Sequence, residues 1–296
     1  MSHPVSKLDQ SKSFSHQVKK ALHTYGLLAT IAKSETLLFE RVTIIHQNNS
    51  LELFMIDLNS WKRPTAIDFY NRCMQEVHSF RQQGKLAIIL WEDQWNRSRN
   101  IVISRIKALL GISARIPGRL TYVARIDKSK TNQFLSENHL QGNVSSKYRY
   151  GLFLPVRYFR ILKQEFAIPN RAEDLLVAVA TFSNARIFQK QDKPFRSFEM
   201  IRFANLLETT VIGGMNKLMA AFSNDFTPDD IMTYADLEWS DGAAYRRLGF
   251  EAVSDKPAIP FWLDESTSAR YSRLDASLPL VAITNAGSRK YVKATK

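Results

Sequence analysis

The sequence is poor in cysteine, and Cys73 is the only one among its 296 residues. A single cysteine excludes an internal disulfide framework and a zinc site built from a cysteine cluster, and we expect no bound metal. No stretch approaches the roughly 20 consecutive apolar residues of a membrane helix. The N-terminal residues also lack the apolar core of a signal peptide. We therefore expect a cytoplasmic protein that does not associate with membranes.

Acidic residues are scarce in the first half of the chain. Residues 1–150 contain 22 Lys and Arg against 11 Asp and Glu, whereas residues 151–296 contain 19 against 17. Between Asn96 and Lys130, nine basic residues accompany a single acid, Asp127. Such a segment can neutralise phosphates and release counterions, although a solvated basic face is the alternative. We expect nucleic acid, double-stranded DNA in particular, to bind at Arg97, Arg99, Arg105, Lys107, Arg115, Arg119, Arg125, Lys128 and Lys130.

The first 117 residues predict a helical extension and a small α/β module. Residues 16–33 have the apolar spacing of a helix. The loop around Pro117 and Gly118 marks the expected domain boundary, so residues 1–35, 36–117 and 118–296 form the three expected parts. The module is predicted to contain paired strands over Leu37–Ile45 and Leu51–Leu58, a helix over Ala66–Gln83, a buried strand over Lys85–Trp91 and a helix over Ile101–Leu110.

Strands alternate with helices in the second half, which again predicts α/β architecture. Pro155–Asp174 is expected to be a loop or a helical excursion. The expected strands are Leu120–Ile126, Tyr150–Leu154, Leu175–Phe182, Ser197–Phe203 and Ile231–Ala235. The expected helices are Lys130–Glu137, a helix that follows the pair Gly213–Gly214 and runs to about Phe222, and Ala243–Leu248.

Two glycines separate a predicted strand from an apolar-periodic helix. Glycine there lets backbone N–H groups approach an anion, and the helix N-terminus adds its dipole. A tight turn explains the same pair, so both interpretations stay open. In the first interpretation the residues that hold a pyrophosphate are Val211, Gly213, Gly214, Asn216 and Lys217.

The run AAYRRLGFEAV at residues 243–253 resembles the helix-and-turn signature of GNAT N-acyltransferases. VIGGMNKL resembles their pyrophosphate loop, with Val211 where the family usually has Gln or Arg. FLSENHLQG, VAVATF, FEMIRF and YADLEWSDGAAYRRLGF extend the resemblance to a phage- and mobile-element-associated branch, over roughly Leu120–Tyr271. The resemblance implies a GNAT-like mixed sheet flanked by helices, acetyl-CoA or another acyl-CoA as donor, and a nucleobase amine as acceptor.

Several residues are candidates for the chemistry of acyl transfer, in which an amine loses a proton and a thiolate gains one. The resemblance places Tyr245 beside the thioester as proton donor, and packing on a helix face is its alternative role. Glu199 can act as general base or pair with Arg202. His139 is a further catalytic candidate. The residues expected to contact the substrate are Asn138, Gln141, Arg202, Asp236, Trp239 and Ser240. Asn138 and Gln141 offer hydrogen-bond donors and acceptors. Asp236, Trp239 and Ser240 follow the carboxyl end of a predicted strand, where ligands bind in α/β sheets.

Residues 70–111 resemble the end of very-short-patch-repair and PD-(D/E)XK endonuclease domains. Their metal chemistry needs an Asp and a (D/E)-x-K pair, and the candidates Glu52, Asp57 and Lys62 lack that spacing. We therefore expect a degenerate, DNA-binding nuclease-like module beside a GNAT-like N-acyltransferase domain. The alternatives are a non-catalytic DNA-binding protein with a GNAT-like fold and a Mg-dependent endonuclease.

Overall fold

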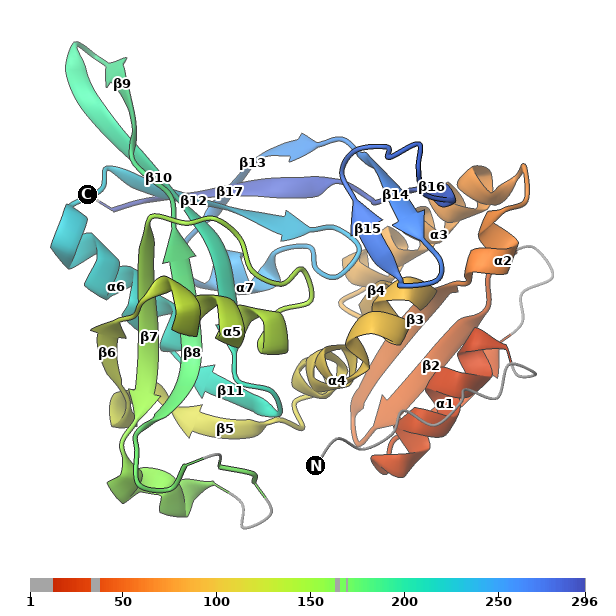
Figure 1. The fold of residues 1–296 in the computed structure, drawn as a ribbon, viewed down its shortest axis with the longest axis horizontal. Helices are drawn as coiled ribbons and strands as arrows, with labels where there is room; N and C mark the ends of the chain where they lie inside the picture. The colour runs from red at the N-terminus through yellow and green to blue at the C-terminus, as the bar shows by residue number, and fades with distance from the viewer. Residues whose placement is uncertain (1–12, 33–37, 163–165, 169, 296) are drawn as a thin grey trace. The chain divides into compact units, whose positions relative to one another are not determined.

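The computed structural model of the chain describes residues 13–32, 38–162, 166–168 and 170–295 (Figure 1). Its contacts separate two compact units, one within residues 1–97 and 261–283 and the other within residues 98–260 and 284–296. Both combine helices with sheets, which confirms the α/β fold class. Within those described ranges, no helix is both long enough and apolar enough to cross a membrane.

Unit 1 is built on a four-stranded sheet in the order β1–β2–β3–β4. The first three strands are antiparallel, and β4 runs parallel to β3. A parallel pair needs a crossover connection, and here helix α3 supplies it and packs against both strands. The elements are α1 (Phe14–Thr24), β1 (Leu28–Ala32), β2 (Arg41–His46), β3 (Asn49–Ile56), α2 (Leu58–Trp61), α3 (Ala66–Gln82) and β4 (Leu86–Trp91).

The predicted helix over residues 16–33 is wrong in its second half. Helix α1 ends at Thr24, because Gly26 adopts φ 71° and Leu28–Ala32 pairs with β2. The predicted strand pair, the α3 helix and the β4 strand are confirmed to within a few residues. Residues 33–37, which the predictions also covered, lie outside the described residues.

A small sheet in the order β15–β14–β16 belongs largely to unit 1. Arg270 binds the buried carboxylate of Asp93 through two hydrogen bonds of 2.6 and 2.9 Å. The Trp61 indole donates to the Ala282 carbonyl at 2.8 Å. The expected domain of residues 118–296 therefore contains a segment that packs with unit 1 instead. The strands of this segment are β14 (Pro260–Asp264), β15 (Ala269–Tyr271) and β16 (Leu280–Thr284).

The division between the units falls inside helix α4 (Glu92–Leu109), where Ser98 departs from helical geometry with φ −136° and ψ 37°. The loop predicted as the boundary instead contains a strand, β5 (Ala114–Pro117), followed by the 3₁₀ turn η1 (Gly118–Leu120). Because β5 pairs in parallel with β11 (Thr209–Ile212), Pro117 lies inside unit 2.

Unit 2 contains a mixed sheet in the order β13–β17–β12–β10–β8–β7–β6, with β9 paired to β10. Every neighbouring pair is antiparallel except β10 with β12. The remaining elements are β6 (Tyr122–Arg125), α5 (Lys128–Asn138), β7 (Tyr148–Leu154), η2 (Val156–Ile161), β8 (Leu175–Phe182), β9 (Arg186–Lys190), β10 (Lys193–Asn205), α6 (Gly214–Phe226), β12 (Asp230–Asp236), α7 (Ala243–Arg247), β13 (Glu251–Lys256) and β17 (Ser288–Ala294).

Helices α5 and α6 cover opposite faces of this sheet. From α6, Phe222 stacks on Phe182 with ring centroids 4.0 Å apart. From α5, Phe134 and Leu135 pack instead against Val179. Phe182 and Val179 lie an odd number of residues apart on β8, so their side chains point to opposite faces of the sheet. This confirms the predicted mixed sheet flanked by helices.

Candidate active site

The two central strands of the unit 2 sheet separate after a short pairing. Strands β10 and β12 pair only from Ser197 to Glu199, opposite Asp230 to Met232. Beyond that point β10 pairs only with β8, and β12 only with β17. The Thr233 hydroxyl donates to the Met200 carbonyl at 3.0 Å across the first step of the gap. The parting strands leave backbone groups on both sides of the gap without a ladder partner among the described residues.

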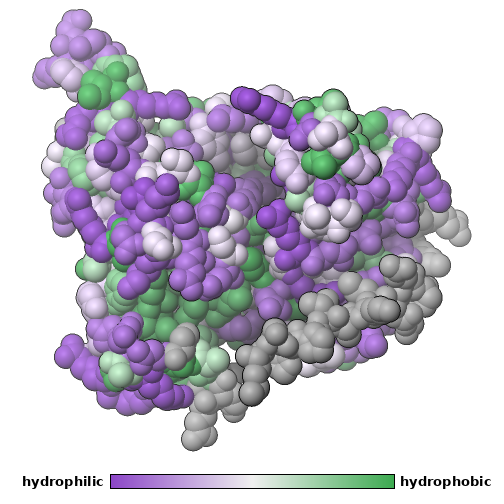
Figure 2. All heavy atoms as spheres, viewed as in Figure 1, coloured by the Kyte–Doolittle hydropathy of each residue, from purple (hydrophilic) through white to green (hydrophobic). Residues whose placement is uncertain are grey.

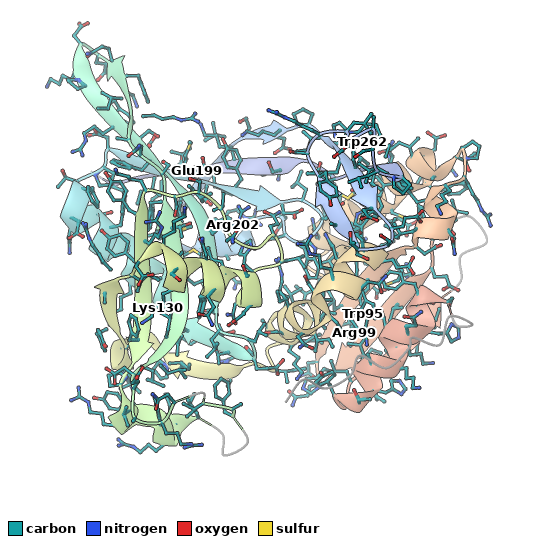
Figure 3. All side chains as sticks on the ribbon, viewed as in Figure 1. Trp95, Arg99, Lys130, Glu199, Arg202 and Trp262 are labelled. Carbon is teal, nitrogen blue, oxygen red and sulfur yellow. The ribbon has the colours of Figure 1, made fainter. Side chains whose placement is uncertain are left out.

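A β-bulge in β10 places two charged residues, Glu199 and Arg202, on the same side of the strand. Both residues are labelled in Figure 3. The register against β8 shifts between Met200 and Arg202. Residues three apart on a regular strand face opposite sides, and one extra residue reverses this. Glu199 and Arg202 are therefore electrostatic neighbours. The main chain of Glu199 is held at 2.9 Å by both the amide and the hydroxyl of Ser183.

Two arginines meet in a half-buried cluster beside the gap. Burial lowers the pKa of both Arg105, from α4, and Arg202, from β10, while nearby Asp236 opposes the effect. The Arg105 guanidinium lies 4.3 Å from the centre of the Trp239 ring. Arg202 donates to the Ile201 carbonyl at 3.0 Å, and its buried Nε has no hydrogen-bond partner in the described part of the chain. The cluster therefore presents hydrogen-bond donors that the fold itself does not use.

His139 is a donor in this cluster. Burial, together with the nearby positive charges of Arg202 and Arg105, lowers its pKa to about 3. Its Nδ1 accepts a hydrogen bond of 3.2 Å from the Gln141 amide. A neutral imidazole that accepts at Nδ1 carries its proton on Nε2. His139 is thus suited to donating a hydrogen bond to a ligand and poorly suited to taking up a proton near neutral pH.

Tyr245 reaches the head of the gap from α7. Its ring packs 5.7 Å from Phe250 and 5.5 Å from Tyr291, and its hydroxyl shares a hydrogen bond with Thr233. Burial raises the pKa of Tyr245, so the hydroxyl stays protonated near neutral pH. The ring packs against its neighbours, which is the alternative role predicted for Tyr245, and the hydroxyl also reaches the point where β10 and β12 part.

The other expected substrate residues have structural partners. Gln141 donates to Asp236 at 3.2 Å, joining the loop after α5 to the end of β12. Asn138 is buried, and it donates to the Phe134 carbonyl at 2.8 Å and accepts from the Leu207 amide at 2.7 Å. Trp239 is also buried, and the Ser240 hydroxyl accepts from the Gly242 amide at 2.9 Å. Asn138, Trp239 and Ser240 thus have structural roles in the surrounding loops, and their contacts with a substrate stay a prediction.

The glycine pair lies at the N-terminus of α6. Gly213 adopts φ 75°, and no heavy atom lies within 4 Å of the position that a Cβ would occupy. At Gly214 a Cβ would lie 2.9 Å from the Cβ of buried Val211, so this position requires glycine. The first amides of a helix have no intrahelical acceptor. The open space at Gly213, the amides of the first turn and the exposed Asn216 fit an anionic group.

Lys217 does not join that group of ligands. Its ammonium donates to the carbonyls of Gly118 at 3.0 Å and Thr121 at 2.5 Å. The side chain therefore fastens α6 to the η1 turn.

The basic residues between Asn96 and Lys130 are dispersed. Lys107 pairs with Glu208 at 2.6 Å, and Arg125 pairs with Asp225 at 2.8 Å. Arg105 lies in the half-buried cluster, and Arg99 is half-buried. Besides the ion-paired Arg125, the exposed members, which come from α4, β5, η1 and α5, are Arg97, Arg115, Arg119, Lys128 and Lys130.

The three nuclease candidates of unit 1 all form ion pairs or hydrogen bonds within the unit. Glu52 lies 3.3 Å from Arg41 in an ion pair, and Asp57 caps helix α2. Lys62 pairs with Glu265 at 2.8 Å. Across the described ranges, no three His, Cys, Asp or Glu side chains gather where they could hold a metal ion.

Two residues of this site, Thr233 and Ser183, were not among the residues expected from the sequence, and a third, Arg105, was expected in another role. Thr233 and Ser183 carry no motif, and their importance comes only from hydrogen bonds across strands. Arg105 was expected to bind nucleic acid, but it contributes to the cluster around Arg202.

No family model matches the sequence, and no curated protein matches it. Among solved structures, a mutant of the AtaT toxin bound to the C-terminus of the antitoxin AtaR and acetyl-CoA is 13% identical, with a TM-score of 0.28 over 46% of this chain and 87% of that one. The KacTA–DNA complex is 19% identical, with a TM-score of 0.28 and the same coverage. A structure of histone acetyltransferase HPA2 and related acetyltransferase from Corynebacterium glutamicum is 12% identical, with a TM-score of 0.33 over 59% of this chain and 96% of that one. These scores are too low to assign an activity.

Proposed function

We propose that unit 2 is a GNAT-like N-acyltransferase that uses an acyl-CoA donor and an acceptor amine carried by nucleic acid. The observation that carries this proposal is the parting of β10 and β12, with Glu199 at the last paired position and the Tyr245 hydroxyl bonded to Thr233 beside it. A gap between central strands gives an extended thioester access to backbone donors, and it brings acid and base candidates to the same point.

The α6 N-terminus is the part of unit 2 that fits the diphosphate of such a donor. Gly213 leaves open space, Gly214 lets the chain turn beside Val211, and the first-turn amides supply donors with the favourable end of the helix dipole. A bound acyl-CoA would supply the thioester carbonyl that an amine attacks. In this proposal Lys217 contributes to the shape of the site and makes no contact with phosphate.

The residues at the head of the gap divide the proton transfers. Glu199 accepts the proton that the amine loses as its nitrogen bonds to the carbonyl carbon. Tyr245, held protonated by burial, gives its proton to the sulfur as the carbon–sulfur bond breaks. His139 donates from Nε2 and takes no proton in this scheme. Tyr245 therefore holds, at neutral pH, the proton that the leaving sulfur takes.

The cluster around Arg202 suits an acceptor rich in hydrogen-bond acceptors, such as a nucleobase edge. Arg202 and His139 supply donors, and Asp236 lies close by. A guanidinium and an imidazole N–H match the acceptor atoms that bases display. The net charge of +13 supports a polyanionic partner, because it raises the local concentration of phosphate-bearing substrates.

The test uses the full chain, acetyl-CoA and a short DNA duplex. Calorimetry measures donor binding, and radiolabelled acetyl-CoA measures transfer to DNA and to free adenosine or cytidine as small acceptors. Saturable donor binding with label transfer supports the proposal. Absence of both would leave unit 2 as a non-catalytic binding domain, and donor binding with transfer only to protein or small amines would remove the nucleic-acid acceptor.

A further inference from the structure

A hairpin of unit 2 projects from the main sheet without being covered by any other described part of the unit (Figure 1). It consists of β9 and the first residues of β10, joined by a two-residue turn in which Gln191 and Asp192 adopt φ 51° and 59°. Residues 186–194 are all exposed. They include Ile187, 66% exposed, and Phe188, 48% exposed. Packing within unit 2 therefore gives no reason for apolar side chains here.

One face of this arm is aromatic and basic. Cross-strand partners in an antiparallel pair point to the same side. Phe188 lies opposite Phe195, with ring centroids 5.0 Å apart, and Lys190 lies opposite Lys193. Arg186 stands two residues before Phe188 and so shares this face. Three cations thus surround two rings, and the face carries no carboxylate. Figure 2 shows hydrophobic spheres among hydrophilic ones on the projecting arm.

The lysine pair of this face has a cost, which the Lys190 ammonium offsets only in part by lying 4.6 Å from the centre of the Phe195 ring. Like charges directly opposite each other on paired strands are destabilising, and Lys190 and Lys193 form such a pair. An external polyanion would convert this repulsion into attraction. Lysine is depleted at the centres of protein–protein interfaces, whereas aromatic rings between cations are typical of surfaces that bind nucleic-acid strands.

We propose that this arm is a nucleic-acid-binding element, with Arg186, Lys190 and Lys193 on phosphates and Phe188 stacked on an unpaired base. The proposal is independent of acyl transfer, because it concerns a surface outside the candidate active site. It also adds a binding element outside residues 96–130, where two of the nine cations are neutralised by ion pairs.

The test compares two arm variants with a matched control in the full chain. The first variant is Arg186→Gln/Lys190→Gln/Lys193→Gln, and the second is Phe188→Ala. The control is Arg157→Gln/Arg160→Gln, which removes two exposed arginines of η2. Because η2 follows the end of β7 at Leu154 and the arm follows the opposite end of the sheet at Phe182, the two sets are well separated.

Fluorescence anisotropy with a short single-stranded oligonucleotide and its duplex, repeated over a range of salt, gives the readout. Loss of three phosphate contacts should reduce the slope of log affinity against log salt by about 2 to 3. Phe188→Ala should keep the slope and weaken single-strand binding by about five- to a hundredfold, the loss of one stacked base. The triple variant should also be at least as resistant to thermal unfolding as the parent, since a repulsive pair is removed.

Three outcomes would overturn the proposal. One is an unchanged salt slope in the triple variant. The second is a loss of nucleic-acid affinity per removed charge that is as large in the η2 control as in the triple variant, which would indicate diffuse electrostatic attraction. The third is a change in sedimentation mass caused by Phe188→Ala with nucleic-acid affinity intact, which would make the arm a self-association surface.

Discussion

The sharpest prediction concerns the Tyr245 hydroxyl. Tyr245→Phe keeps the ring and its contacts with Phe250 and Tyr291, and it removes the hydrogen bond with Thr233. Loss of one hydrogen bond costs about 1 kcal/mol of unfolding free energy. Loss of a general acid lowers turnover by about 10²–10⁴-fold, which corresponds to roughly 3–5 kcal/mol of activation free energy. The effect on catalysis should therefore exceed the effect on stability several times over.

The comparison variant is Tyr150→Phe, which removes another phenol of unit 2, on strand β7. The Tyr150 hydroxyl donates to Asp225 at 2.6 Å and has no place in the proposed chemistry. Urea unfolding should give similar stability losses for both variants, while initial rates of acetyl transfer fall only in Tyr245→Phe. Equal rates in the two variants, within about threefold, would refute the role of Tyr245 as proton donor.

The pH profile gives a second reading of the same residue. Burial raises the pKa of Tyr245, so the acid is present at neutral pH and is lost only as pH rises beyond the ordinary phenol range. The parent rate should therefore show no loss from this group below about pH 10. A descending limb near neutral pH that disappears in Tyr245→Phe would contradict this assignment.

Three further results follow from the structure. Gly242→Ala should lower the unfolding free energy of unit 2 by about 3 kcal/mol or more, because φ is 79° and a Cβ would lie 2.3 Å from the Tyr291 ring. In the control Gly249→Ala, where φ is 80°, a Cβ would meet only the end of a lysine at 3.9 Å, so urea unfolding should show a loss of about 1–2 kcal/mol. Lys217→Met should lower thermal stability and leave acetyl-CoA affinity in calorimetry unchanged, because the ammonium binds carbonyls of η1 and the adjoining residue. His139→Gln should flatten the loss of stability on acidification, because a pKa lowered to about 3 means that stability present above about pH 6.5 is lost as pH falls toward 3.

Much of the sheet in unit 2 could be predicted from the sequence, because its buried strands are apolar and bounded by turns. Leu175–Phe182 was predicted with the bounds that β8 has, and the helices after the glycine pair and around Tyr245 were also confirmed. The short β5–β11 pair was missed because its four-residue strands contain Pro117 and little periodicity. Strand β9 was missed because it is exposed on both faces, and such a strand shows no alternation of apolar and polar residues.

The site was harder to predict than the sheet. The residues near the gap were found through the motifs that contain them, but their roles depended on geometry that spacing does not determine. The bulge after Met200 changes which residues share a face with Glu199. The tautomer of His139 follows from one hydrogen bond, which its Nδ1 accepts from the main-chain amide of Gln141. Sequence spacing predicts neighbours along an element, whereas these features depend on how elements meet.

The bond between Arg270 and Asp93 has a consequence for synthesis on the ribosome. The two residues are 177 positions apart. A nearly buried carboxylate without its partner is costly, so the amino-terminal unit cannot reach its final state until almost the whole chain has emerged. Nascent unit 1 therefore stays incomplete while the ribosome synthesises the intervening sheet of unit 2. Truncation after residue 260 would therefore damage the beginning of the protein, which had been translated long before the stop.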